Sequence, residues 1–248
     1  TMSACVGTSA TLSGTPTGGG WSSSNPSVAN IDGSGQYIGY TAGTATMTYA
    51  LGTGCFSTAV VTINAVPASI TGTMSICEGA SIILGSSTAG GSWSSSNTAV
   101  ATVDSTGLAN GIAAGNATIT YTQGGCSTTA NLTVQPIPSA IAGALAVCEG
   151  NTGTLTNASS GGTWLSDNTA VATVGSATGM VTGIAAGTAN VTYTVSTGCA
   201  VTAVVTVNGV PGSITGTGTV CTGTTTTLSC TTTGGTWVTT TPSVATIG

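Results

Sequence analysis

The sequence predicts an all-β protein, a row of small β-sandwich domains of about 72 residues stacked head to tail. The first observation is a repeat, because tryptophans at positions 21, 93, 164 and 237 are separated by 72, 71 and 73 residues. The second is an alternation of apolar and polar residues, clearest where Ala117, Ile119 and Tyr121 alternate with threonines. Such alternation between glycine-rich turns is typical of half-buried antiparallel strands, and no segment has helical periodicity.

The strands are easiest to place in the unit that begins at Pro67, where we expect seven of them. The expected positions are a strand near Ser69–Thr73, one through Ile82 and Leu84, one carrying Trp93, Ala99–Val103, Leu108–Ala113, one through Ala117–Tyr121 and one through Ala130–Val134. Seven short strands in about 72 residues are typical of an immunoglobulin-like sandwich.

A recurring Pro-x-Ser/Ala-Ile-x-Gly segment marks the boundaries between units, at Pro67–Gly72, Pro138–Gly143 and Pro211–Gly216. It predicts a first repeat (residues 1–66) that lacks its first strand and two complete repeats, the second (67–137) and the third (138–210). The fourth repeat (211–248) contains first strands only. No flexible linker separates the repeats, so we expect neighbours to abut. Because both ends of the sequence fall inside a repeat, we also expect the 248 residues to be part of a longer array.

One motif follows each tryptophan. In the first repeat it reads Trp-Ser-Ser-Ser-Asn-Pro from Trp21 to Pro26, then Val28 and Ala29, and later Gly43–Ala45 and Tyr49. This pattern resembles the bacterial immunoglobulin-like domains of group 2, which are stalk and adhesive modules of secreted or cell-surface proteins. The resemblance implies an immunoglobulin-like fold and an extracellular location, and it brings no catalytic residues with it.

The composition excludes most other functional classes, since the chain has no Lys, Arg or His and only five acidic residues. A chain of this length with ordinary composition would have about sixty charged residues. Without cations it cannot neutralise nucleic-acid phosphates or anionic lipid, and without His it lacks the usual general base. We therefore expect no nucleic-acid binding, no enzymatic activity, no cofactor and no membrane span.

Aromatic residues that recur at the same position of the repeat are the candidates for the core of each repeat. The predicted core aromatics are Trp21, Trp93, Trp164, Trp237, Tyr49, Tyr121 and Tyr193. The alternative for the tryptophans is a platform on which sugar rings stack. Asp32 and Asp104 are equivalent acids that we expect in solvated turns; calcium is the alternative, but such a site needs several converging oxygens.

Seven of the eight cysteines hold two fixed places in the repeat. The early cysteines are Cys5, Cys77, Cys148 and Cys221, and the late cysteines are Cys55, Cys126 and Cys199. No C-x-x-C motif is present, so a zinc or redox site is not expected. Cys230 has no counterpart in the other repeats, and no role is assigned to it.

Immunoglobulin-like topology places the early and late cysteines of one domain at opposite poles, separated by roughly 25 Å. A disulfide needs Cα atoms within about 7 Å, so we predict bridges across domain boundaries, Cys5–Cys126 and Cys77–Cys199. Pairing within a domain, pairing between chains and free thiols stay open as alternatives. Under the predicted scheme the partners of Cys55, Cys148 and Cys221 lie outside the 248 residues.

These features together predict a structural component of a rigid, disulfide-stapled filament or adhesin stalk on a bacterial surface. Its partners would be neighbouring repeats and other copies of itself, since a weakly charged surface favours lateral association. The alternative is an adhesin module that binds glycans or a partner surface. That alternative requires exposed aromatics, for which the sequence offers Tyr37, Tyr40 and Phe56.

Overall fold

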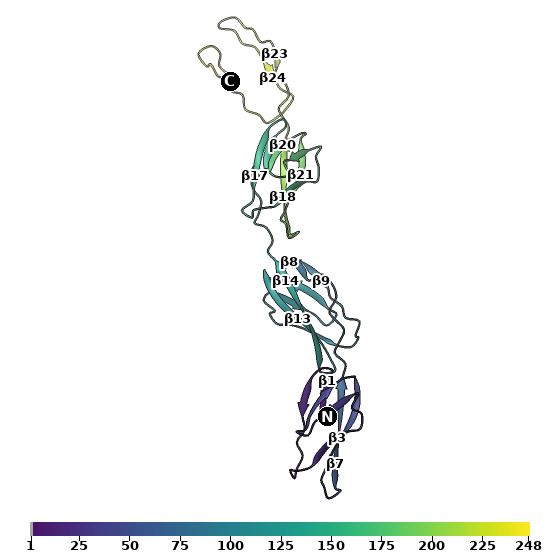
Figure 1. The fold of residues 1–248 in the computed structure, drawn as a ribbon. Helices are drawn as coiled ribbons and strands as arrows, with labels where there is room; N and C mark the ends of the chain where they lie inside the picture. The colour runs from purple at the N-terminus through teal and green to yellow at the C-terminus, as the bar shows by residue number, and fades with distance from the viewer. Residues whose placement is uncertain (1) are drawn as a thin grey trace. The chain divides into compact units, whose positions relative to one another are not determined.

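A computed structural model describes residues 2–248, and every regular element in that range is a β-strand (Figure 1). The chain divides after Ile137 into two compact units. The first unit contains the first and second repeats, and the second unit contains the third and fourth. The prediction of an all-β fold of tandem immunoglobulin-like sandwiches is confirmed. No helix in residues 2–248 is long and apolar enough to cross a membrane.

The first repeat, drawn in purple and blue in Figure 1, folds into two facing sheets. Its strands are β1 (Met2–Cys5), β2 (Ser9–Thr11), β3 (Gly20–Ser23), β4 (Ala29–Ile31), β5 (Gln36–Gly39), β6 (Gly43–Ala50) and β7 (Phe56–Asn64). One sheet has the order β1-β7-β6-β3 and the other β2-β5-β4. β1 runs parallel to β7, which places Cys5 opposite Asn64.

The second repeat has the same architecture. Its strands are β8 (Ser75–Cys77), β9 (Ser81–Ile83), β10 (Ser92–Ser95), β11 (Ala101–Val103), β12 (Leu108–Gly111), β13 (Gly115–Gln123) and β14 (Cys126–Gln135). The sheets have the orders β10-β13-β14-β8 and β11-β12-β9. The hairpin of β13 and β14 is the longest, and its register pairs Gln123 with Cys126 across a two-glycine turn.

In the second unit the third repeat is again complete. Its strands are β15 (Ala142–Gly143), β16 (Ala146–Cys148), β17 (Thr152–Thr156), β18 (Thr163–Ser166), β19 (Ala172–Val174), β20 (Met180–Gly183), β21 (Gly187–Thr194) and β22 (Ala200–Asn208). They form sheets of order β16-β22-β21-β18 and β15-β17-β20-β19. In the fourth repeat only β23 (Thr215–Gly216) and β24 (Leu228–Ser229) pair.

Each of the first three repeats has its own core between its two sheets. In the second repeat Leu84, Ala101 and Ala109 come from one sheet and its adjoining loop, while Ile119 and Leu132 come from the other. Ile119 and Leu132 are completely buried, and burying one such side chain contributes roughly 1.5 to 3 kcal/mol. Equivalent clusters fill the first and third repeats. The alternation seen in the sequence therefore corresponds to the inward face of each strand.

The expected strand at Ser69–Thr73 is wrong as a continuous element. This segment makes a single bridge, between Thr71 and Gly85, and Gly72 then adopts a φ of +124°. That left-handed backbone turns the chain away from the sheet of β9. The chain next forms β8, which lies beyond the expected strand and runs parallel to β14 in the other sheet.

Candidate functional site

The candidate site is the junction between the first and second repeats, where two cysteines meet. Cys5 ends β1 at the end of β7, and Cys126 begins β14 just after the turn at Gly124 and Gly125. The structure joins Cys5 to Cys126 by a disulfide, with Cα atoms 5.7 Å apart and a sequence separation of 121. A covalent bridge thus links the two repeats in addition to the backbone.

Polar contacts surround this bridge. The side-chain Nδ2 of Asn64, at the end of β7, donates a hydrogen bond of 2.6 Å to the carbonyl oxygen of Gly124. The Cys126 Sγ lies 3.7 Å from the carbonyl oxygen of Asn64. Gly124 and Gly125 have φ values of +60° and +81°, a conformation that glycine adopts without strain. The turn can therefore lie directly against the end of the first repeat.

Sequence reasoning did not identify Asn64 as part of this junction. The sequence contained a sign of this role, because each of the first three repeats has an Asn or Gln at the end of its last strand, opposite the early cysteine. Gln135 is paired with Cys77 and Asn208 with Cys148, just as Asn64 is paired with Cys5. These Asn and Gln residues lie beside the early cysteines in the folded chain, although they are far from them in the sequence.

The strand lengths explain why the cysteines of one repeat do not meet. Cys126 opens β14, whereas Cys77 lies beside Gln135 at the other end of that strand. A strand of ten residues spans roughly 33 Å, far beyond the reach of a disulfide. The opposite-pole geometry expected from the sequence holds within the second repeat.

The other cysteines fall into two groups. Cys77 and Cys199 are disulfide-bonded cysteines. Cys55, Cys148 and Cys221 are exposed free cysteines, and Cys230 is a half-buried one. The Cys230 thiol donates a bond of 3.2 Å to the carbonyl oxygen of Gly212, which gives this residue a local structural contact.

The repeated tryptophan and tyrosine form a ring pair in each of the first three repeats. The ring centroids are 4.7 Å apart for Trp21 and Tyr49, and 4.6 Å apart in the second and third repeats. Trp164 is buried, while Trp21 and Trp93 are half-buried against their cores. The rings of each pair are tilted by 48° to 50°, and the three pairs belong to or pack against the cores of their repeats.

Each tyrosine hydroxyl also fastens a loop. In the second repeat the Tyr121 hydroxyl accepts a 2.8 Å hydrogen bond from the amide of Gly91 and donates one of 2.6 Å to the carbonyl oxygen of Thr88. A Cβ on Gly91 would overlap with the tyrosine ring. The loops can approach these rings because Gly19, Gly91 and Gly162 have no Cβ.

Trp237 differs from the other three tryptophans, because 40% of its surface is exposed. Its place in a core stays a prediction.

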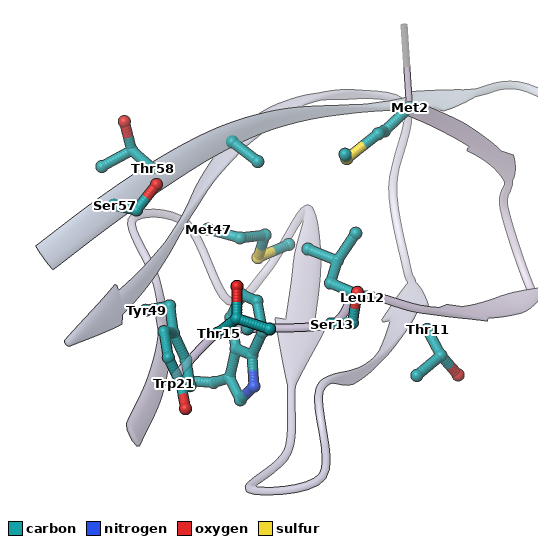
Figure 2. Close-up of a pocket in the computed structure, with 12 residues that line it drawn as sticks. Met2, Thr11, Leu12, Ser13, Thr15, Trp21, Met47, Tyr49, Ser57 and Thr58 are labelled. Atoms are coloured by element: carbon teal, nitrogen blue, oxygen red, sulfur yellow. The ribbon is translucent and has the colours of Figure 1, made fainter. Parts of the chain in front are cut away.

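A groove lies beside the ring pair of the first repeat (Figure 2). Its volume is about 420 Å³, and its lining residues include Leu12, Met47, Tyr49, Trp21 and Met2. Figure 2 shows Trp21 and Tyr49 together at one end, with Met2 and Leu12 at the other. The lining contains no charged side chain, so the groove suits an apolar or uncharged polar occupant.

Asp32 and Asp104 hold turns through their side chains. The Asp104 carboxylate accepts hydrogen bonds from the Thr106 hydroxyl at 2.6 Å, the Thr106 amide at 2.8 Å and the Leu108 amide at 3.0 Å. These bonds, that of the Thr106 hydroxyl foremost, lower the pKa of Asp104, and the bond from Ser34 does the same for Asp32. No cluster of three metal-ligating side chains occurs within residues 2–248.

The exposed aromatics are fewer than the sequence suggested. Tyr37 is buried, with only 2% of its surface exposed, because it faces the core of the first repeat from β5. Tyr40 and Phe56 are 52% and 70% exposed. Of the three aromatic residues that the sequence suggested for a binding surface, only these two are exposed.

Comparison with known proteins identifies the repeat. Residues 84–134 and 150–207 match the family model described as Bacterial Ig-like domain (group 2). Domains 1–6 of the surface layer protein SbsC match with 15% identity over 87% of this chain and 40% of that chain, at a TM-score of 0.29. No curated protein sequence matches the chain at a significant level.

Two further solved structures have similar scores. A C-terminal 282-residue fragment of intimin, in complex with the translocated intimin receptor's intimin-binding domain, has 13% identity over 68% of this chain and 59% of that chain, with a TM-score of 0.34. BT4661, a SusE-like surface-located polysaccharide-binding protein from Bacteroides thetaiotaomicron, has 14% identity over 84% of this chain and 45% of that chain, also at 0.34. The chain spans about two fifths of the length of the surface layer structures. At these scores the structural matches carry no argument about function.

Proposed function

This chain carries bacterial immunoglobulin-like domains of group 2, and on that premise we propose that it is a structural segment of a rigid extracellular filament or adhesin stalk. Its role is mechanical: it holds a length of the surface structure extended and bears tension. The chain has no enzymatic role in this proposal, which is supported by the use of Asp32 and Asp104 in turns.

The observation that carries the proposal is the bridge between Cys5 and Cys126. Tension that enters at the beginning of the first repeat reaches Cys5 after a few residues and crosses directly to Cys126. When this bridge acts alone, residues 6–125 are not stretched, because the covalent route around them is shorter. The loop closed by this bridge contributes about 4 to 5 kcal/mol to stability by chain-entropy arithmetic.

We propose the same arrangement at the boundary between the second and third repeats, because the repeats are equivalent. Cys77 and Cys199 stand in the second and third repeats where Cys5 and Cys126 stand in the first and second. We propose that these two half-cystines pair with each other, and that Cys55, Cys148 and Cys221 take partners outside the 248 residues. We place the repeat boundaries at Pro67, Pro138 and Pro211, giving repeats of residues 1–66, 67–137, 138–210 and 211–248.

The surface chemistry supports an extracellular setting and self-association along or across a filament. Disulfides persist in oxidising compartments. A net charge of −5 with no cations provides little repulsion between neighbouring copies. The missing Lys and Arg also leave a trypsin-like protease without a cleavage site, an advantage for a surface stalk.

Non-reducing peptide mapping tests the pairing. Because the chain has no Lys or Arg, the digestion uses a protease that cleaves after aromatic residues. We expect one disulfide-linked peptide pair containing Cys5 and Cys126 and another containing Cys77 and Cys199. Recovery of Cys77 linked to Cys126 would refute the cross-boundary scheme.

Imaging tests the mechanical role. Electron micrographs of the oxidised chain should give a narrow distribution of angles between the first and second repeats. Replacing Cys5 and Cys126 by Ser should broaden it, while replacing the exposed free Cys55 by Ser should not. Equal distributions in all three proteins would contradict the proposed stiffening.

The second candidate function is binding of glycans by an adhesin module. Two exposed aromatic rings of the first repeat, Tyr40 and Phe56, favour it, since aromatic rings stack on sugars. A glycan array with the wild-type chain and a Tyr40→Ala, Phe56→Ala variant tests this candidate. Binding that is lost in the variant would support it, and absence of binding to any glycan would leave the structural role alone.

A further inference from the structure

The cysteines of this chain could pair in many ways before any disulfide is formed. Eight cysteines allow about a hundred fully paired connectivities, and Cys5 and Cys126 lie far apart in the sequence. Correct pairing therefore depends on contacts that hold these two residues together while they are still thiols. The boundary between the first and second repeats contains such contacts on both of its sides.

The first repeat fixes the backbone of Cys5. The Thr8 hydroxyl accepts a 3.0 Å hydrogen bond from the Cys5 amide and donates one of 2.8 Å to the Cys5 carbonyl oxygen. The Thr8 amide donates a further bond of 3.0 Å to the same oxygen. Cys5 also lies opposite Asn64 in the parallel pairing of β1 with β7. The early cysteine is thus held in place by its own repeat, whether it is oxidised or reduced.

The Asn64 side chain reaches from the first repeat to the second. Its Nδ2 donates a hydrogen bond of 2.6 Å to the carbonyl oxygen of Gly124, in the two-glycine turn that ends at Cys126. Because this turn is short, a bond to the Gly124 carbonyl also fixes where Cys126 lies relative to Cys5. No sulfur atom takes part in this bond, so reduction of the bridge leaves the bond in place.

Each sulfur atom of the bridge also lies near a carbonyl oxygen of the opposite repeat. The Cys126 Sγ is 3.7 Å from the Asn64 carbonyl oxygen, and the Cys5 Sγ is 3.8 Å from that of Gly125. A thiol is a weak hydrogen-bond donor, so both cysteines can use these oxygens when they are reduced. The two repeats therefore keep contacts across their boundary that do not need the disulfide.

The two cysteines differ in their access to solvent. Cys126 is 1% exposed, whereas Cys5 is half-buried. The same difference recurs between Cys199, which is completely buried, and Cys77, which is half-buried. Thiol–disulfide exchange requires access to the sulfur that reacts. The early cysteine is therefore the one that an external oxidant reaches first.

We propose that Asn64 is a positioning residue for the formation of this disulfide, in which Cys5 reacts first with the oxidant and Cys126 then closes the bridge. By holding the turn of the second repeat against the first, the Asn64 amide selects Cys126 as the partner of Cys5. The inference rests on the observed bridge and its surroundings, and it does not depend on the mechanical role proposed above.

A low-molecular-weight disulfide supplies the oxidising equivalents. The Cys5 thiolate attacks one sulfur of this molecule, which forms a mixed disulfide at Cys5 and releases one small thiol. Cys126 then loses its proton to water and attacks the Cys5 Sγ. The bond between the two protein sulfurs forms, and the second small thiol leaves. Two protein thiols are thereby oxidised, and one small disulfide is reduced to two thiols.

Exchange with a coloured reagent tests this order in the full chain. The reagent is dithiobisnitrobenzoate, an aromatic disulfide that releases a coloured thiol. The rate of the first release rises with reagent concentration and reports the attack by Cys5. The rate of the second release is independent of that concentration and reports closure by Cys126. In the parent protein for this assay, serine replaces the six other cysteines, Cys55, Cys77, Cys148, Cys199, Cys221 and Cys230.

Asn64→Ala should slow the second release by about fivefold, the effect of losing one hydrogen bond, and should leave the first release unchanged. The Asn64 side chain lies outside the core of the first repeat, so this variant keeps the repeat folded. The matched control is Asn208→Ala, which removes the amide at the same place in the third repeat, beside position 148. This control should leave both releases unchanged.

Two single-cysteine chains test which sulfur reacts first. Cys126→Ser should give the first release at the parent rate and no second release. Cys5→Ser should react about tenfold more slowly than the parent protein, because Cys126 is buried and access limits the exchange.

Three outcomes overturn the proposal. They are closure at the parent rate in Asn64→Ala, an equal slowing of both releases in that variant, and a chain with Cys126 alone that reacts as fast as a chain with Cys5 alone. Peptide mapping of the pairing and imaging of the angles do not depend on the rate of closure. Failure here therefore leaves the proposed function standing.

Discussion

The length of the chain under force depends on how its disulfides overlap, and it can be calculated from residue numbers. The perturbation is reduction of the disulfides in a chain held at residues 1 and 248, with the free cysteines replaced by Ser. The bridge from Cys5 to Cys126 spans 121 residues, and the proposed bridge from Cys77 to Cys199 begins inside that span. Three segments of the chain then connect the two bridges in parallel: Cys5 to Cys77, Cys77 to Cys126, and Cys126 to Cys199. The shortest, from Cys77 to Cys126, limits how far the bridges can separate.

The magnitudes follow from the extended length of a residue. At about 3.6 Å per residue, the fully extended chain with both bridges measures about 370 Å, and the reduced chain about 890 Å. With Cys5→Ser and Cys126→Ser, the remaining proposed bridge allows about 450 Å before reduction. Reduction should therefore lengthen the doubly bridged chain by about 520 Å and the variant by about 440 Å.

Single-molecule force spectroscopy measures these lengths directly. Pairing within the second repeat, Cys77 with Cys126, would give about 710 Å before reduction and a gain of about 180 Å. That result would refute the overlapping scheme. A chain in which only Cys55 is replaced by Ser should give the same lengths as the wild type, because the Cys55 thiol takes part in neither bridge.

Three further predictions concern the second repeat. Tyr121→Phe leaves the Gly91 amide and the Thr88 carbonyl without their partner, so it should destabilise the repeat by about 1 to 3 kcal/mol, seen as faster hydrogen exchange in β13. Gly107→Ala places a Cβ against the Leu84 carbonyl oxygen at a φ of +87° and should cost about 1 to 3 kcal/mol in urea unfolding, whereas Gly33→Ala, in open space, should be neutral. The lowered pKa of Asp104 contributes stability that is present above about pH 4 and is lost as the pH falls through the folded-state pKa. Asp104→Asn should therefore reduce the drop in melting temperature between pH 7 and pH 3, and an unchanged drop would contradict this assignment.

The sequence predicted the strands well wherever one face of a strand is buried. The strand from Gly115 to Gln123 and its partner contain apolar residues at every second position, and this pattern specifies both the strand and its inward face. The segment Ser69–Thr73 was predicted less well, because it contacts one sheet through a single bridge before Gly72 redirects it. An alternation of apolar and polar residues does not show that the chain moves from one sheet to the other. That move depends on one backbone angle, the φ of Gly72.

The candidate site was predictable in part, for a geometric reason. Strand length alone placed Cys77 and Cys126 too far apart to pair, so the partner of each was predicted in a neighbouring repeat. The role of Asn64 could not be predicted this way, because it is next to Cys5 only through the parallel pairing of β1 with β7.

The bridge between Cys5 and Cys126 also determines what a single cut in the backbone does to this chain. A protease that hydrolyses one peptide bond anywhere between these two cysteines opens a ring but does not divide the molecule, because the sulfur bond still joins its two portions. A surface structure made in this way keeps its continuity after a nick that would sever an unbridged polypeptide.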